Sequence, residues 1–211
     1  MNQKAKIAVI GGTGKAGKYL VKELLRQDFP LKLLLRNPGD FSFENPDIEV
    51  IQGDARDYET VRTLKEGCGA VVSAVGFRAG KEPIFSIATG NVLRAMQEWN
   101  ITRYISLTGL NVDTPFDQKT GATQAGTEYM RANYPKTTAD KQVEYQKLTE
   151  SDAAWVLVRL PWIQLTEAEE DVKVSLEDCP GEAVSASALA RFVVAQLTND
   201  TYVRQAPFVA N

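Results

Sequence analysis

The chain has 211 residues, of which 44% are hydrophobic and 24% are charged, with a formal net charge of −3 and no histidine. This composition is typical of a globular domain that buries its core without disulfides, and the acidic balance disfavours general nucleic-acid binding. The two cysteines, Cys68 and Cys179, form neither a disulfide framework nor a metal-binding spacing, and no apolar run is long enough to span a membrane. We therefore expect a cytoplasmic protein with no metal, no membrane segment and no nucleic-acid partner, while its oligomeric state stays open.

Apolar, β-branched runs alternate along the chain with segments of helical periodicity. Strands are predicted at residues 7–10, 31–36, 47–54, 70–76, 103–109 and 154–161, with a further short one at 172–176. Helices are predicted from the spacing of Leu20, Val21, Leu24 and Leu25, and then at residues 58–66, 84–99, 140–151 and 187–197, the last capped by Ser185 or Ser187. Near-continuous apolar strands between amphipathic helices predict an α/β fold with a Rossmann-type doubly wound parallel sheet, as a single domain over residues 1–211.

Residues 111–137 interrupt this alternation. The segment has few apolar residues at a fixed period, and it contains Pro115, Gly121, Gly126 and Pro135. We predict an irregular substrate loop and a short substrate-side lobe, because the segment follows a strand at the carboxyl edge of the sheet, where such folds bind ligands. Its side chains suited to covering a flat acceptor are Phe116, Tyr129, Met130 and Tyr134.

Glycines recur between the first strand and the first helix, in the sequence GGTGKAG. Gly11 permits a tight turn, Gly14 lets the backbone approach a pyrophosphate, and Gly17 lets the helix pack against the strand. The spacing G-x-G-x-x-G that begins at Gly12 is the fingerprint of dinucleotide binding when it follows a strand, and the alternative is a turn that holds no ligand. A P-loop is excluded because no Gly-Lys-Ser/Thr closes the motif.

The end of the second predicted strand indicates which dinucleotide is bound. NAD-preferring domains carry an acidic residue there, which binds the ribose hydroxyls, but this chain has Arg36 followed by Asn37. A guanidinium suits a 2′-phosphate through bidentate bonds, and Lys15 in the glycine turn adds a second cation. The residues therefore favour NADP(H), and NAD(H) is the alternative if Arg36 is only a solvated charge at a strand end.

Six motifs follow one another along nearly the whole chain: GGTGKAG, LLLRNP, VIQGDARD, AVVSAVG, ISLTG and WVLVRLPWI. In this order they resemble the atypical short-chain dehydrogenases/reductases, and in particular their NmrA-like group, which includes a flavin reductase. The resemblance implies a Rossmann-type sheet that binds NADP.

The resemblance also implies which residues meet each part of the cofactor. Gly11, Thr13, Gly14, Lys15 and Ala16 would line the pyrophosphate beside Gly17, and Arg36 and Asn37 would lie at the 2′-phosphate. Asp54 and Ala55 would flank the adenine, and Ala74, Val75 and Gly76 the ribose. Pro161, Trp162 and Ile163 would lie beside the nicotinamide, with ordinary core packing as the alternative for the last two. Arg78 resembles an arginine at the mouth of the site in the flavin reductase.

The chain departs from many short-chain dehydrogenases where acid–base chemistry is expected. Their Tyr-x-x-x-Lys pattern would place a tyrosine four residues before Lys141, but this chain has Thr137 there, and Gly109 replaces the serine expected after Thr108. A threonine hydroxyl is a poor acid at neutral pH, so chemistry that needs a poised tyrosine is not expected. Thr108, Lys141 and Arg78 are the candidates for positioning an acceptor.

The function favoured by these residues is an NADP-dependent oxidoreductase that passes hydride from the nicotinamide to a small flavin- or quinone-like acceptor. Such acceptors can collect a proton from water, and the cofactor carries the redox chemistry. Two alternatives stay open. One is a non-catalytic, NAD(P)-sensing NmrA-like regulatory protein, which the missing tyrosine favours, and the other is a relative of nucleotide-sugar epimerases and dehydratases, which the short chain disfavours.

Overall fold

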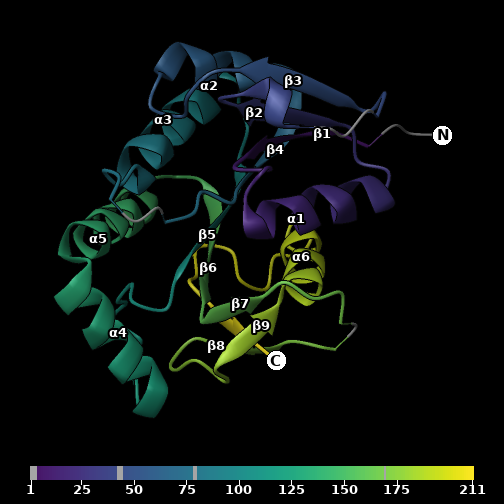
Figure 1. The fold of residues 1–211 in the computed structure, drawn as a ribbon. Coiled ribbons are helices and arrows are strands. Elements are labelled where there is room, and N and C mark those ends of the chain that lie inside the picture. The colour runs from purple at the N-terminus through teal and green to yellow at the C-terminus, as the bar shows by residue number, and fades with distance from the viewer. Residues whose placement is uncertain (1–3, 42–44, 78–79, 169) are drawn as a thin grey trace.

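Apolar runs form one large, mostly parallel sheet in the computed structural model, which describes residues 4–41, 45–77, 80–168 and 170–211 (Figure 1). The strand order is β3-β2-β1-β4-β5-β6-β10-β8, and only the β10–β8 pair is antiparallel among the described strands. The strands of this sheet are β1 (Lys6–Ile10), β2 (Leu31–Leu35), β3 (Ile48–Gln52), β4 (Cys68–Ser73), β5 (Arg103–Gly109), β6 (Ala154–Leu160), β8 (Lys173–Ser175) and β10 (Phe208–Ala210). The order reverses between β1 and β4, so the doubly wound prediction is confirmed.

Helices cover both faces of the sheet (Figure 1). Helices α1 (Lys15–Arg26) and α6 (Ala186–Ala195) pack together on one face, and α2 (Tyr58–Lys65), α3 (Phe85–Glu98) and α5 (Pro135–Glu150) cover the other. Because both faces are covered, side chains that point to either face of a central strand are buried. Every residue of β2 is buried. Ser185, and not Ser187, caps α6 by accepting from the Ala188 N–H.

The prediction of an irregular loop over residues 111–137 is wrong in part. Residues 121–133 form α4 (Gly121–Asn133), and α5 begins at Pro135, five residues earlier than predicted. Helix α4 lacked an apolar stripe in the sequence because it buries only Thr123 and Thr127. The ribbon shows that α4 lies further from the centre of the sheet than α5 does (Figure 1).

The loop between β5 and α4, residues 110–120, is tied to the sheet by Arg159. This fully buried guanidinium of β6 donates to Asp117 Oδ1 at 2.6 Å, to Val112 O at 3.2 Å and to Leu176 O at 3.1 Å. Thr120, at the start of α4, donates its backbone N–H to Asp178 at 3.2 Å. The loop is therefore fixed at several points along its length.

A second, two-stranded sheet follows the carboxyl end of β6. It pairs β7 (Trp162–Gln164) in parallel with β9 (Ala183–Ser185). Neither strand was predicted, nor was β10, because such short strands depend on partners distant in the sequence, whereas the short strand predicted at 172–176 is confirmed as β8. A short 3₁₀ turn, Pro38–Asp40, follows β2.

Candidate cofactor and reaction site

The turn between β1 and α1 depends on glycine at two positions. Gly11 has a φ of +80°, in the left-handed region that favours glycine. A Cβ on Gly11 would lie 2.5 Å from Ala74 O, and a Cβ on Gly17 would lie 2.1 Å from Gly11 O. The Gly14 N–H closes the turn by donating to Gly11 O at 3.0 Å. These contacts hold the turn against the end of β4 and the start of α1.

Helix α1 begins with backbone donors that no side chain caps. Gly14 is the N-cap in an extended conformation, and the first turn holds no acidic residue. A Cβ on Gly14 would lie 3.2 Å from Gly11 O and 3.9 Å from Ala74 O, in the gap between the turn and β4. The free N–H groups and the dipole of a helix start attract anions. The residues present therefore fit the pyrophosphate of a dinucleotide, and the binding roles of Thr13, Lys15 and Ala16 stay predictions.

Arg36 and Asn37 directly follow β2, next to the glycine turn in the sheet. Arg36 is exposed and makes no ion pair with the described residues. Asn37 is the N-cap of the 3₁₀ turn. An exposed, unpaired guanidinium at this edge is available to a phosphate, so the predicted role of Arg36 is compatible with the fold.

The loop after β3 is fixed by a residue that the sequence analysis missed. Asp54 accepts the Arg56 N–H at 2.9 Å and pairs with its guanidinium at 3.2 Å. Asn91 of α3 donates to Ala55 O at 2.9 Å and to Arg56 O at 3.0 Å. Asp54 and Ala55 thus lie in an ordered loop at the carboxyl edge, where the resemblance expects the adenine.

The end of β4 is joined to the end of β1. The Ala74 N–H donates to Ile10 O at 2.8 Å, and Ala74 itself is buried. Val75 and Gly76 follow, and a Cβ on Gly76 would meet nothing within 4 Å. The glycine at 76 is therefore not required by packing within the described chain, which leaves room for a ligand there.

Residues 161–163 connect β6 to β7, with Pro161 directly after β6. The Trp162 side chain is 74% exposed, whereas Ile163 packs against the core on the α1 and α6 face. The core-packing alternative therefore holds for Ile163 but not for Trp162. An exposed tryptophan at this edge suits contact with a ligand.

Lys141 of α5 reaches the carboxyl end of β5. A Cβ on Gly109 would lie 3.0 Å from Lys141 Nζ and 2.5 Å from Asn111 Oδ1. The position where a serine was expected is thus a glycine because these two side chains fill the space. Lys141 Nζ lies 5.0 Å from the centre of the Phe85 ring and makes no ion pair or hydrogen bond with the described residues.

Burial sets the electrostatics of this centre. It lowers the pKa of Lys141 to about 8, although the nearby Glu144 carboxyl acts in the opposite direction. Thr108 directly precedes Gly109 on β5, and its hydroxyl is buried with no partner among the described residues. The last residues of β5 therefore carry an unpaired hydroxyl at Thr108 and, at Gly109, a neighbouring ammonium whose pKa is lowered; Thr108 and Lys141 were both predicted site residues. Arg78, the third candidate, lies outside the described residues.

Glu144 forms a buried polar network that the sequence analysis missed. Its Oε1 accepts from the Ser106 hydroxyl at 2.9 Å and from the Thr89 hydroxyl at 2.9 Å. The Tyr104 hydroxyl lies 3.0 Å from Thr89 Oγ1. Burial raises the pKa of Glu144 to about 7 against the effect of these hydrogen bonds and of Lys141. The spacing of Thr137, Lys141, Glu144 and Leu148, all buried on α5, is the sequence pattern that could have indicated it.

Aromatic side chains flank the same edge. The Phe77 and Tyr134 rings are 4.7 Å apart and edge to face, and Tyr129 follows at 6.3 Å from Tyr134. Phe77 follows β4, and Tyr134 joins α4 to α5. Phe77 and Tyr129 are exposed, so this row offers apolar surface to a flat ligand.

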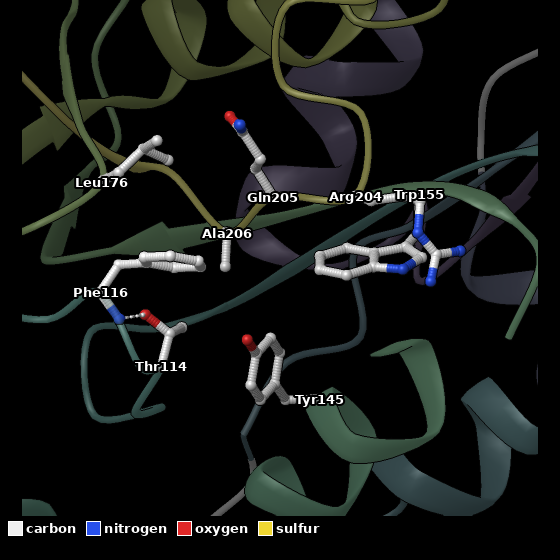
Figure 2. A pocket seen from close by; sticks show the side chains of 8 residues that line it. All are labelled: Thr114, Phe116, Tyr145, Trp155, Leu176, Arg204, Gln205 and Ala206. Carbon is white, nitrogen blue, oxygen red and sulfur yellow. Dashed lines mark hydrogen bonds between the residues drawn. The ribbon is translucent and has the colours of Figure 1, made fainter. Parts of the chain in front are cut away.

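Phe116 does not join this row, contrary to its predicted place among the covering side chains. It lines a separate cavity of about 100 Å³ with Thr114, Tyr145, Trp155, Leu176, Arg204, Gln205 and Ala206 (Figure 2). Its ring lies against Ala206, across the cavity from Trp155 (Figure 2). The cause is the anchoring of residues 110–120 by Arg159, which holds Phe116 on the α5 face of the sheet.

The sheet order, the glycine turn and the open start of α1 define a Rossmann-like reductase fold of the kind that binds NAD(P)H. Residues 11–200 match the NAD(P)H-binding family, and the chain belongs to that family.

Solved structures share the fold over almost the whole chain. ChuY, an anaerobillin reductase from Escherichia coli O157:H7, superposes with a TM-score of 0.80 at 17% identity, covering 97% of this chain and 96% of that one. A short-chain dehydrogenase/reductase from Veillonella parvula in complex with NADP gives 0.74 at 16% identity, covering 98% and 94%. At these identities the likeness establishes the fold alone.

Curated relatives match this chain over shorter stretches than the solved structures do. An isoflavone reductase homolog A622-like protein of Nicotiana tabacum is 29% identical over 124 residues, which are 54% of this chain and 38% of that protein. Phenylcoumaran benzylic ether reductase 1 of Arabidopsis thaliana is 34% identical over 85 residues, 36% of this chain and 28% of that protein. The chain therefore spans well under half the length of these relatives. Separately, no helix in the described part of the chain is long and apolar enough to cross a membrane.

Proposed function

We propose that this protein is an NADPH-dependent reductase of a flat, flavin- or quinone-like acceptor, with Lys141 as the proton donor. The observation that carries the proposal is the position of the Lys141 ammonium over Gly109, at the sheet edge that also carries the glycine turn. β1, β4 and β5 are neighbours in the sheet, so β1 and β5 are two strand spacings apart, or roughly 10 Å. A dinucleotide laid across β1 and β4 would bring its reactive end toward this ammonium.

The cofactor, when bound, supplies the hydride. Lys141 would give the acceptor the proton that accompanies the hydride, and its amine would then recover a proton from solvent. Burial helps this step because it weakens the hold of Lys141 on its proton, and acids with a pKa near the working pH transfer protons best. The missing tyrosine of Tyr-x-x-x-Lys is then not needed.

The surroundings of Lys141 support a planar acceptor. Phe77 and Tyr134 form an edge-to-face pair beside the site, and Trp162 is exposed where β6 ends. Flat conjugated rings bury much area against aromatic side chains at low conformational cost. Flavins and quinones have such rings, and the reductase relatives reported above are compatible with this class.

A second candidate is a protein that senses the NADP/NADPH ratio without turnover. Thr137 in place of the tyrosine favours it. The two candidates differ in one measurable respect, because a sensor binds NADPH but reduces no acceptor.

The test is steady-state oxidation of NADPH across a panel of flavins, quinones and tetrapyrroles, with wild type and Lys141→Met. We expect at least one acceptor to be reduced, and we expect Lys141→Met to lower kcat about 100-fold or more, the usual contribution of a positioned acid. The Kd for NADPH should change little. Lys147→Met is the matched control, since Lys147 is exposed on the same helix. Tight NADPH binding with no acceptor reduced would favour the sensor, and an active Lys141→Met would remove the proposed proton donor.

A further inference from the structure

A second ionisable group, Glu144, is buried in the same helix as Lys141. Glu144 follows Lys141 by three residues, so the two side chains lie on one face of α5. Both residues are buried, with exposed fractions of 6% for Lys141 and 2% for Glu144. Neither forms a salt bridge with any described arginine, lysine or carboxylate that would satisfy its charge elsewhere.

The carboxyl of Glu144 is held on one side only. Its Oε1 accepts from the Ser106 and Thr89 hydroxyls, both at 2.9 Å. Its Oε2 is buried with no hydrogen-bond partner among the described residues. A buried carboxyl oxygen without a partner is costly unless a charge or a proton compensates it.

Strand β5 presents a row of polar side chains to α5. Tyr104, Ser106 and Thr108 alternate along β5 and so point to one face of the sheet, the face that α5 covers. Ser106 meets Glu144, and Gly109, one residue after Thr108, approaches Lys141. A polar stripe therefore leads from the buried Tyr104 to the reacting edge.

The charged and titratable groups around the pair are few. Asp140 of α5 accepts from the Phe85 and Ser86 N–H groups at the start of α3, at 2.7 and 3.3 Å, and its charge opposes ionisation of Glu144. From β5, Tyr104 faces the network, and burial raises its pKa so that it stays neutral. From α3, Thr89 and the Phe85 ring add no charge. Lys141 is thus the one cation acting on Glu144 among the described groups.

We propose that Glu144 is a positioning residue for the Lys141 ammonium: its carboxylate, held by Ser106 and Thr89, keeps Lys141 charged and ready to donate its proton. This inference rests on the role proposed above for Lys141. Two buried groups that interact in this way titrate as a pair, so loss of one charge changes the protonation of the other.

The test removes the charge of Glu144 and keeps its shape. In Glu144→Gln the amide oxygen can still accept from both hydroxyls, but it no longer stabilises the cation. We expect the pH at which the Lys141 amine titrates, followed by ¹⁵N NMR of the lysine Nζ atoms with and without NADPH, to fall by about one unit or more. The alkaline limb of the kcat profile should move down by the same amount. Glu150→Gln, an exposed change on the same helix, should move neither.

A second variant keeps the proposal testable if Glu144→Gln does not fold. Ser106→Ala removes one hydrogen bond from the carboxylate and should lower the Lys141 titration in the same direction by a smaller amount. An unchanged Lys141 titration in a folded Glu144→Gln or Ser106→Ala variant would overturn the inference, even if stability fell. If the titration shifts while no acceptor is reduced, Glu144 does control Lys141 and the proposed reductase activity is what fails.

Discussion

At the scale of single residues, burial alone does not identify a functional lysine. Lys65 is fully buried, and burial lowers its pKa to about 6, further than for Lys141. Its Nζ, however, donates to Val92 O and so joins α2 to α3. Lys141 Nζ has no such partner in the part of the chain that the structure describes, and it lies over the end of β5. A perturbed pKa marks a candidate, and the contacts of the nitrogen distinguish a structural amine from a reactive one.

Arg36 carries the prediction of cofactor preference at the same scale. We expect Arg36→Ala to weaken NADPH binding about tenfold or more, because loss of hydrogen bonds to a charged group costs roughly 1.5–3 kcal/mol. NADH lacks the 2′-phosphate, so its Kd should stay nearly the same. Titration of both cofactors by calorimetry measures this.

The control for Arg36 is Arg62→Ala, which removes another exposed arginine from α2, where it pairs with Glu98. It should alter neither affinity. Equal affinity of the wild-type protein for NADPH and NADH would contradict the assignment of Arg36 to the 2′-phosphate.

At the scale of elements, two glycines of the turn from β1 into α1 are expected to have different roles, one in cofactor binding and the other in folding. In Gly14→Val the backbone φ of −69° accepts a side chain, and the new Cβ meets only Gly11 O, at 3.2 Å, and Ala74 O. We expect a folded protein that no longer binds NADPH, since the side chain occupies the space in front of the helix. Gly17→Ala should instead lower the free energy of unfolding by about 1–3 kcal/mol, because its Cβ would overlap Gly11 O.

Denaturant unfolding and NADPH titration distinguish these two outcomes. Gly90→Ala is the matched control, because a Cβ there meets only the end of the Lys147 side chain at 3.7 Å. It should not lower the free energy of unfolding, since alanine is a better helix former than glycine, and it should leave NADPH binding unchanged. Full NADPH affinity in folded Gly14→Val would mean that the glycine motif is only a turn.

Elements with strong periodicity could be predicted from the sequence, and polar ones could not. The strand at 103–109 matches β5 at both ends, because its apolar run is bounded by polar residues and glycine. Helix α4 was missed because its two buried residues are threonines, and glycine residues interrupt it. The three-residue strands β7, β9 and β10 depend on pairing partners distant in sequence.

The candidate site likewise has a part that the sequence could predict and a part that it could not. The glycine turn could be predicted because its function requires a local sequence pattern. Glu144, Ser106 and Asn91 could not, because their roles arise from contacts between segments 36 to 55 residues apart. Lys141 was identified from the Tyr-x-x-x-Lys pattern, but the reason for Gly109 emerged only from the atoms that fill its space.

At the scale of the whole molecule, the segment after β5 combines a fixed part with a loosely packed one. Arg159 and Asp178 hold residues 110–120 to the sheet. Helix α4 buries only two residues, and Arg131 near its end pairs with Asp113. Stability is thus expected to be lower in α4 than in the loop before it, since few buried contacts oppose local opening.

Hydrogen exchange of residues 111–137 therefore tests what this segment does for the whole protein. If it covers the acceptor, amides of α4 should exchange more slowly when a flavin or quinone is added to the NADPH complex, because the ligand orders the Tyr129 and Tyr134 surface. If the protein is a sensor, NADP and NADPH alone should give different exchange in α4. The amides of residues 110–120 are the internal control, because the contacts of Arg159 should protect them in every state. Exchange of α4 that is identical in the free, NADP, NADPH and acceptor-bound states would reject both roles and leave α4 as a surface helix outside the reaction.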